Sequence, residues 1–72
     1  MSKYDWSKVY RPKDRWIATD ADGNAFAWEG KPEIVGDEWN STKEKIGDYF
    51  LKASENPYKG DWQDSLEERP NE

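Results

Sequence analysis

The chain has 72 residues, no Cys, no His and a formal net charge of −5 at pH 7. This length allows one domain, near the lower limit for an unaided core, and the composition excludes disulfides, zinc fingers, thiol nucleophiles and imidazole bases. The acidic balance opposes direct binding to nucleic acid or to an anionic membrane surface. Because the other usual aids to a small core are excluded, we expect a homo-oligomer.

Aromatic residues decide between disorder and a folded domain. With 38% charged residues, the chain resembles disordered sequences in its average polarity. However, it holds five Trp, four Tyr and two Phe, and each large ring buries roughly 150–250 Å². We therefore predict an ordered domain with an aromatic core.

No targeting signal is visible in the sequence. No apolar run approaches the length of a transmembrane span, and the residues from Met1 to Trp6 lack the apolar stretch of a signal peptide. We therefore expect the product to stay in the cytoplasm of the cell that makes it.

The first segment, residues 1–14, is predicted to be an N-terminal arm. Asp5 is placed to cap a short helical turn from Trp6 to Val9, which ends before Pro12.

Residues 16–29 contain the clearest local signal, a β-hairpin. Two β-prone runs flank Asp22-Gly23, a dipeptide that favours a type I′ turn. Such a turn pairs Thr19 with Phe26 and Ile17 with Trp28. This register places Trp28 in the core and Trp16 on the opposite, outward face of the sheet.

The remaining elements are weaker. A third strand is expected within Ile34–Asn40 with Trp39 as its anchor, and a fourth over Ile46–Leu51. Residues 15–52 then form the sheet core and residues 53–60 a loop. Asp61 is predicted to cap a short helix over 61–69 that Pro70 ends. The predicted fold class is α+β but β-dominated: a small antiparallel β-sheet of three or four strands with a short C-terminal helix.

Two familiar kinds of chemical site fail on inspection. Asp20, Asp22 and Asn24 match the first ligands of a calcium loop, but the sixth position is Ala25 and the twelfth is Lys31. Adjacent carboxylates such as Glu67-Glu68 do not supply two different environments across a pocket. We predict no catalytic residues, no metal and no cofactor, and therefore no enzyme.

Aromatic and basic residues favour a ligand site. A Trp ring stacks on a nucleobase while a nearby cation meets its phosphate. For any one Trp, a place in the core is the commoner role, but five in a chain this short favour at least one at a functional surface. The candidate ligand-binding residues are Trp16, Arg15, Arg11, Asp20, Trp39 and Asn40.

Acidic residues support a competing interpretation. They dominate the second half of the chain, from Asp37 to Glu68. Along one face they would imitate the phosphates of DNA and occupy a host nucleic-acid-binding protein. A solvated surface that aids solubility is the simpler explanation.

The two ends of the chain also resemble a known group. The opening SKYDWSKV (residues 2–9), the WIATDADG hairpin (16–23), Lys31-Pro32 and the ending DWQDSLEERP (61–70) resemble small uncharacterised accessory proteins of tailed bacteriophages. The resemblance implies a setting, an infected bacterium, and the role that such proteins often have, countering host defence. It implies no functional residue.

The function predicted from these observations is non-catalytic anti-defence in the host bacterial cytoplasm. The chain would act as a sponge, a homo-oligomer that sequesters a nucleotide-type signalling molecule of the host's immune response. The alternative is a stoichiometric protein–protein inhibitor of a bacterial host protein, and a structural or regulatory phage protein is a third possibility.

Overall fold

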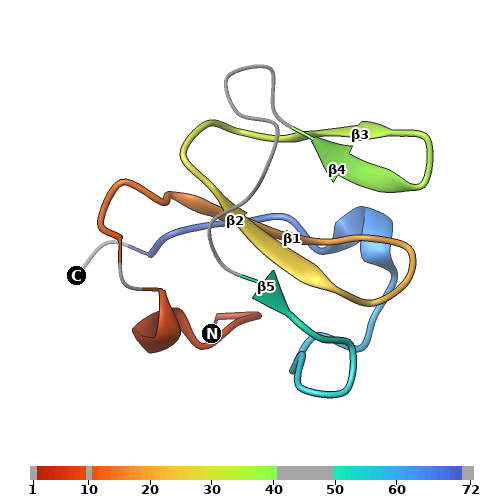
Figure 1. Cartoon of the computed structure of the whole chain (residues 1–72), viewed down its shortest axis with the longest axis horizontal. Helices are drawn as coiled ribbons and strands as arrows, with labels where there is room; N and C mark the ends of the chain where they lie inside the picture. Colours follow the sequence, from red (N-terminus) through yellow and green to blue (C-terminus); the bar gives the residue numbers. More distant parts are fainter. Residues whose placement is uncertain (1, 10, 41–49, 71–72) are drawn as a thin grey trace.

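The computed structural model describes residues 2–9, 11–40 and 50–70, which form two small antiparallel sheets and two 3₁₀ turns (Figure 1). The four-stranded sheet has the order β5-β2-β1-β6, and the two-stranded sheet pairs β3 with β4. The β-dominated fold is therefore confirmed. The elements are η1 (Trp6–Lys8), β1 (Trp16–Thr19), β2 (Ala25–Trp28), β3 (Glu33–Val35), β4 (Glu38–Asn40), β5 (Phe50–Leu51), η2 (Trp62–Asp64) and β6 (Glu67–Glu68).

The β1–β2 hairpin is confirmed, but its predicted turn is wrong. Asp20 N donates to Asn24 O (2.8 Å) and Gly23 N to Asp20 O (2.9 Å), so the loop has three residues. Gly23 has a φ of 94°, and no described non-glycine residue has a positive φ. A type I′ turn would have forced Asp22 into that conformation, whereas a three-residue loop confines it to the glycine.

The longer loop shifts the register by one residue and exchanges the faces of β2. Trp16 lies opposite Trp28, and Ile17 opposite Ala27. The prediction that the two Trp residues lie on opposite faces is therefore wrong. Ile17 and Ala27 face the core, while Trp16 and Trp28 share the other face of the sheet.

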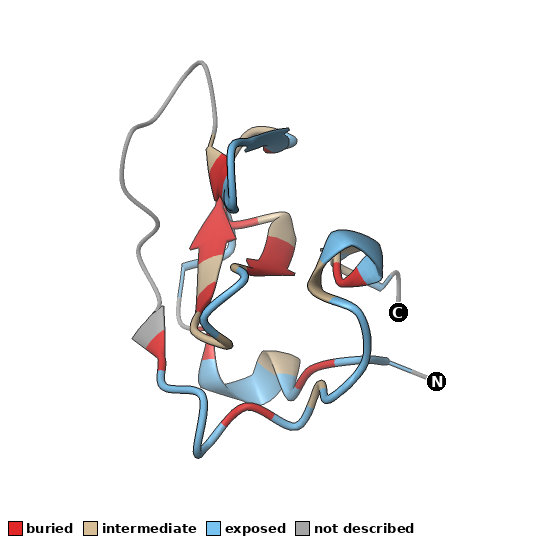
Figure 2. Cartoon of the chain, turned by 90° about the vertical axis from the view of Figure 1, so that its right-hand side faces the viewer, coloured by how far each residue is buried: buried red, intermediate tan, exposed pale blue. Residues whose placement is uncertain are grey.

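The core face is built from β1, β2, β5 and the N-terminal arm. Its buried cluster contains Ile17, Ala25, Ala27, Leu51, Tyr4 and Val9. The two alanines leave room for larger side chains from outside the hairpin, so the arm contributes Tyr4 and Val9 to the core. Figure 2 shows the buried strands at the centre of the molecule and both chain ends on one side of them.

Residues 33–40 form a second hairpin rather than the single third strand that was predicted. β3 and β4 pair in the register Val35↔Glu38, which leaves a two-residue turn at Gly36-Asp37. Gly36 has a φ of 67° and Asp37 does not have a positive φ, the pattern of a type II′ turn. Trp39 is buried, as the anchor of this segment was expected to be.

The predicted helix over 61–69 is wrong. Asp61 caps the segment as predicted, because its Oδ1 accepts from Gln63 N (2.9 Å), but η2 ends after one 3₁₀ turn. The chain then becomes β6, which pairs with Trp16 and Ile17 of β1. Of the predicted fourth strand, Phe50–Leu51 form β5, and residues 46–49 lie outside the described residues.

A buried polar network joins these elements. Ser65 Oγ accepts from Thr19 N (2.7 Å), and Ser65 O accepts from the hydroxyl of Tyr4 (2.9 Å). Asn56 Nδ2 donates to Thr19 Oγ1 (2.9 Å) and to Gly23 O (3.0 Å). Thr19 thus connects the arm, the 53–60 loop and the C-terminal segment inside a small core, where paired polar groups fix a single arrangement.

The two chain ends hold each other. Glu67 accepts from Trp6 Nε1 (2.8 Å) and from the backbone amide of Lys3 (3.0 and 3.1 Å). The guanidinium of Arg69 lies 4.9 Å from the centre of the Trp6 ring and donates to the carbonyls of Asp14 and Arg11. Residues 5–9 and 61–70 therefore include contacts that close the fold.

Candidate ligand site

Trp16 lies half-buried at the start of β1, on the face of the sheet away from the core cluster. Residues directly opposite in an antiparallel pair point to the same face. Trp28 of β2 and Glu68 of β6 therefore flank Trp16 on that face. The ammonium of Lys31 lies 5.7 Å from the centre of the Trp16 ring, within cation–π range.

Trp28 gives this face an unusual polar group. Its side chain is 97% buried, and its indole Nε1 has no hydrogen-bond partner among the described residues. A buried donor without an acceptor costs about 1–3 kcal/mol. The ring packs near Phe26, with a centroid separation of 6.3 Å.

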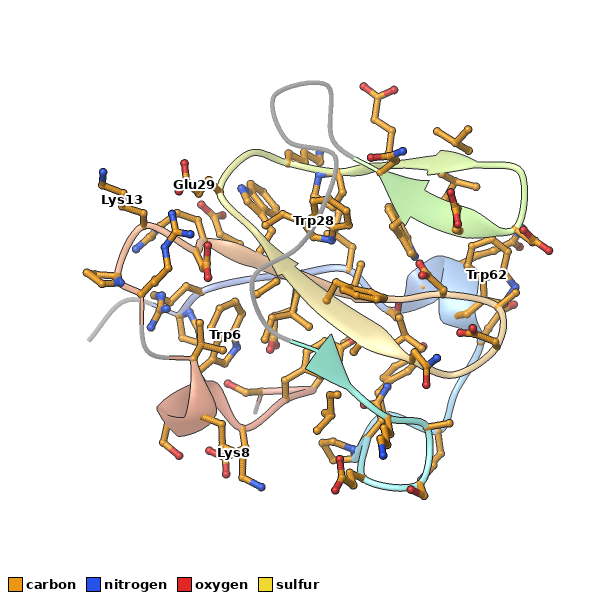
Figure 3. All side chains as sticks on the ribbon, viewed as in Figure 1. Trp6, Lys8, Lys13, Trp28, Glu29 and Trp62 are labelled. Carbon is orange, nitrogen blue, oxygen red and sulfur yellow. The ribbon has the colours of Figure 1, made fainter. Side chains whose placement is uncertain are left out.

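Basic side chains gather where β1 begins and β2 ends. Arg15 N donates to Trp28 O, and Arg69 N donates to Arg15 O, so three segments of the chain meet at this end. Figure 3 shows Lys13 and Glu29 at the same end of the molecule. The cationic residues placed here, which we call the basic end, are Arg11, Lys13, Arg15, Lys31 and Arg69, and the carboxylates of Glu29 and Glu68 lie among them.

Not all of these cations are equally available to a ligand. Arg11 forms an ion pair with Glu29, and Arg69 is held by backbone carbonyls and the Trp6 ring. Lys13 and Lys31 are exposed, and Arg15 is half-buried. Lys31 is the cation that the structure places against the Trp16 ring, on the face of the sheet away from the core cluster.

The other three predicted site residues lie away from Trp16. Asp20 follows the far end of β1, four residues or roughly 13 Å along the strand direction. Its Oδ1 accepts from Trp39 N (2.8 Å), and the buried ring of Trp39 donates through Nε1 to Trp62 O (3.2 Å). Asn40 ends β4, next to Trp39. The six predicted residues therefore form two separate groups.

The Asp20 group belongs to an acidic end of the molecule. Burial raises the pKa of the Asp20 carboxyl, the hydrogen bond from Trp39 N lowers it, and the charges of Asp22, Glu38 and Asp37 raise it further. Asp61 and Asp64 belong to the η2 segment, which Trp39 joins to β4. Figure 3 shows Trp62 of η2 at the end opposite Lys13. The acids of both hairpin turns and of the η2 segment thus lie at the end of the described structure away from Trp16.

A hollow of about 190 Å³ lies elsewhere, beside Tyr4 and Leu51 of the core face. Asp5, Lys8, Glu55 and Pro57 complete its lining. None of the six predicted ligand residues lines it, and its position beside the core face separates it from Trp16.

Neither a metal centre nor a membrane span is found in the described part of the chain. No three acidic, His or Cys residues gather there as metal ligands. No helix in residues 2–9, 11–40 and 50–70 is long and apolar enough to cross a membrane.

Lys31 and Glu68 are the neighbours of Trp16 that were not predicted. Lys31 follows Gly30 at the end of the hairpin, and its position in the sequence does not predict contact with the Trp16 ring. Glu68 carries no local signal, because the pairing of β6 with β1 joins segments about 50 residues apart.

Comparisons of this chain with protein-family models, with curated proteins and with solved structures found no match.

Proposed function

We propose that this chain is a non-catalytic binding protein that sequesters a nucleotide signalling molecule. In the setting that the resemblance implies, it is a phage anti-defence sponge that removes an immune signal in the cytoplasm of the bacterial host. It acts stoichiometrically, as a homo-oligomer.

The observation that supports the proposal most is the contact between the half-buried indole of Trp16 and the ammonium of Lys31. Trp16 offers a ring, and Lys31 brings an ammonium to 5.7 Å from its centre. Stacking of a base on an aromatic side chain contributes about 1–3 kcal/mol. The ammonium meets the phosphate, and the surrounding Arg and Lys residues attract an anion despite the negative total charge.

The proposed site keeps three of the six predicted residues and gains one. Trp16 stacks on the base, Lys31 binds phosphate, Arg15 contributes positive potential, and Arg11 lies beside it in an ion pair with Glu29. Asp20 and Trp39 are left out because a hydrogen bond joins them at the far end of β1, and Asn40 because it follows Trp39 on β4.

Isothermal titration of the purified chain with a panel of linear and cyclic nucleotides tests the proposal. Trp16→Phe keeps a stacking ring, whereas Trp16→Leu keeps an apolar side chain without one. We expect Trp16→Phe to bind within a few-fold of wild type and Trp16→Leu to lose about ten-fold or more, the equivalent of one stacked base.

Trp62→Leu is the matched control, because Trp62 is also half-buried but lies in η2 at the acidic end. Thermal melts establish that each variant is folded, and native mass spectrometry gives the subunit number. Equal losses in Trp16→Leu and Trp62→Leu, or no binding by wild type, would overturn the proposal.

The acidic end supports one alternative, inhibition of a basic or nucleic-acid-binding host protein. Backbone contact between Ala21 and Asp37 (3.1 Å) brings the acidic turns of the two hairpins together. Such binding should weaken as salt is added, and replacing Asp37 by Asn and Glu38 by Gln should abolish it. The same two substitutions would leave nucleotide binding at Trp16 intact.

A further inference from the structure

The carboxylate of Glu68 has a position that suggests which base the site takes. Glu68 lies directly opposite Trp16 across the β1–β6 pair. Cβ atoms of such pairs are about 4.5–5.5 Å apart, and both side chains point to the same face. Glu68 is exposed and forms no ion pair among the described residues.

A base that stacks on Trp16 therefore presents one edge to a carboxylate. An ionised carboxylate only accepts hydrogen bonds, with two oxygens side by side. It is matched by an edge with two adjacent donors and repelled by an edge that carries an acceptor lone pair.

Guanine is the common base with that edge. Its N1–H and N2–H groups are neighbouring donors on the Watson–Crick edge. Adenine and cytosine place a ring-nitrogen acceptor beside their amino group, and uracil places carbonyl oxygens on both sides of its single N–H. A bidentate, charge-assisted contact with Glu68 is open to guanine alone among these four.

We propose that Glu68 is the specificity-determining residue of the Trp16 site and that the ligand is a guanine nucleotide. The inference rests on the proposed function, since it assumes that a base stacks on Trp16. Lys31, whose ammonium lies 5.7 Å from the ring centre, then binds the phosphate.

Titrations with GMP, IMP and AMP, and with cyclic diguanylate and cyclic diadenylate, test the inference. Hypoxanthine in IMP keeps N1–H but lacks the N2 amino group, so the expected order of affinity is GMP, then IMP, then AMP. The guanine-to-adenine preference of wild type should be roughly 5- to 100-fold, the range for one bidentate base contact.

Glu68→Gln supplies the decisive variant, because an amide replaces one acceptor by a donor at nearly the same shape. We expect the guanine preference to fall to within about three-fold while the variant stays folded. Glu33→Gln on β3 makes the same change of charge at another exposed glutamate and should leave the preference intact.

Nucleotide binding at Trp16 and guanine specificity through Glu68 are tested separately. If adenine nucleotides bind as tightly as guanine nucleotides or more tightly, and Trp16→Leu still weakens their binding, guanine specificity is overturned. The proposed nucleotide sequestration at Trp16 is then retained. An unchanged guanine preference in Glu68→Gln overturns the role of Glu68. Absence of binding by every nucleotide overturns both.

Discussion

Removal of the Ser65 hydroxyl tests the polar network that holds the core. Ser65 is fully buried, its Oγ accepts from Thr19 N (2.7 Å), and it donates to Trp62 O (2.6 Å). Ser65→Ala leaves the buried Thr19 amide without an acceptor, at a cost of about 1–3 kcal/mol, and removes a donated bond worth about 1 kcal/mol. We therefore expect a loss of roughly 2–4 kcal/mol in the free energy of unfolding.

Urea unfolding followed by Trp fluorescence measures this loss, and a thermal melt should show Tm lowered by roughly 10–25 °C for a chain of this size. Ser7→Ala is the matched control. It removes a hydroxyl that donates to the exposed carboxylate of Asp5 (2.5 Å), while the backbone cap from Ser7 N remains. If Ser65→Ala lost no more stability than Ser7→Ala, the hydroxyl would not be closing the core as we argue.

Three further variants probe other contacts. Arg69→Lys should cost about 1–2 kcal/mol in urea unfolding, because an ammonium cannot hold two backbone carbonyls and cover the Trp6 ring as the planar guanidinium does; a stability equal to wild type would contradict this. Gly23→Ala should cost about 1–3 kcal/mol, since it places a side chain at a φ of 94° and its Cβ 2.7 Å from that of Ala53; a melt unchanged by the substitution would refute it. Asp20→Asn should stabilise the fold at pH 7 by less than about 1 kcal/mol, because solvent screens this half-buried carboxyl. The pKa of Asp20 is raised in the fold, so its ionisation costs stability as pH rises through that pKa. The advantage of the variant should vanish below the ordinary pKa of 3.8, and its persistence there would refute the assignment.

Local sequence predicted the place of the first hairpin but not its register. Asp22-Gly23 fits both a two-residue and a three-residue loop. The three-residue loop makes contacts with residues distant in the sequence. Asn24 Oδ1 accepts from Ala53 N (2.9 Å), and Asn56 Nδ2 donates to Gly23 O. A shift of one residue then exchanged the faces of β2, which is why Trp28 and Trp16 were wrongly separated.

The second hairpin and the last strand were missed for different reasons. Gly36-Asp37 is a local signal for a type II′ turn, and reading it would have split the predicted third strand into β3 and β4. β6 carries no such signal, since Glu67-Glu68 has low strand propensity. It pairs with β1 because Glu67 and Arg69 are anchored on the N-terminal arm.

In the candidate site, too, local sequence places some residues, and pairing between distant segments places the others. Trp16 was found from composition and its place at the start of a strand, which local sequence specifies. Its acidic and cationic neighbours, Glu68 and Lys31, come from other strands or the turn that follows them, so their placement depended on the register. Asp20 and Trp39 were grouped with Trp16 by residue type, but the hydrogen bond between them commits both to holding β4 on the sheet.

Charge polarity connects the fold to the function that we propose. A chain with a net charge of −5 repels an anionic ligand on average, yet the basic end concentrates Arg and Lys beside Trp16 while the acids of both hairpin turns and η2 lie at the other end. Potentials add over the whole protein but decay within about 8 Å at physiological ionic strength. At that range the acids of the far end contribute little, and the charges nearest Trp16 are the ammonium of Lys31 and the carboxylate of Glu68. Salt should therefore weaken nucleotide binding at Trp16 through the loss of local attraction. If binding instead strengthened with salt, the net negative charge would be the dominant field, and a nucleotide phosphate would have no favourable place at this site.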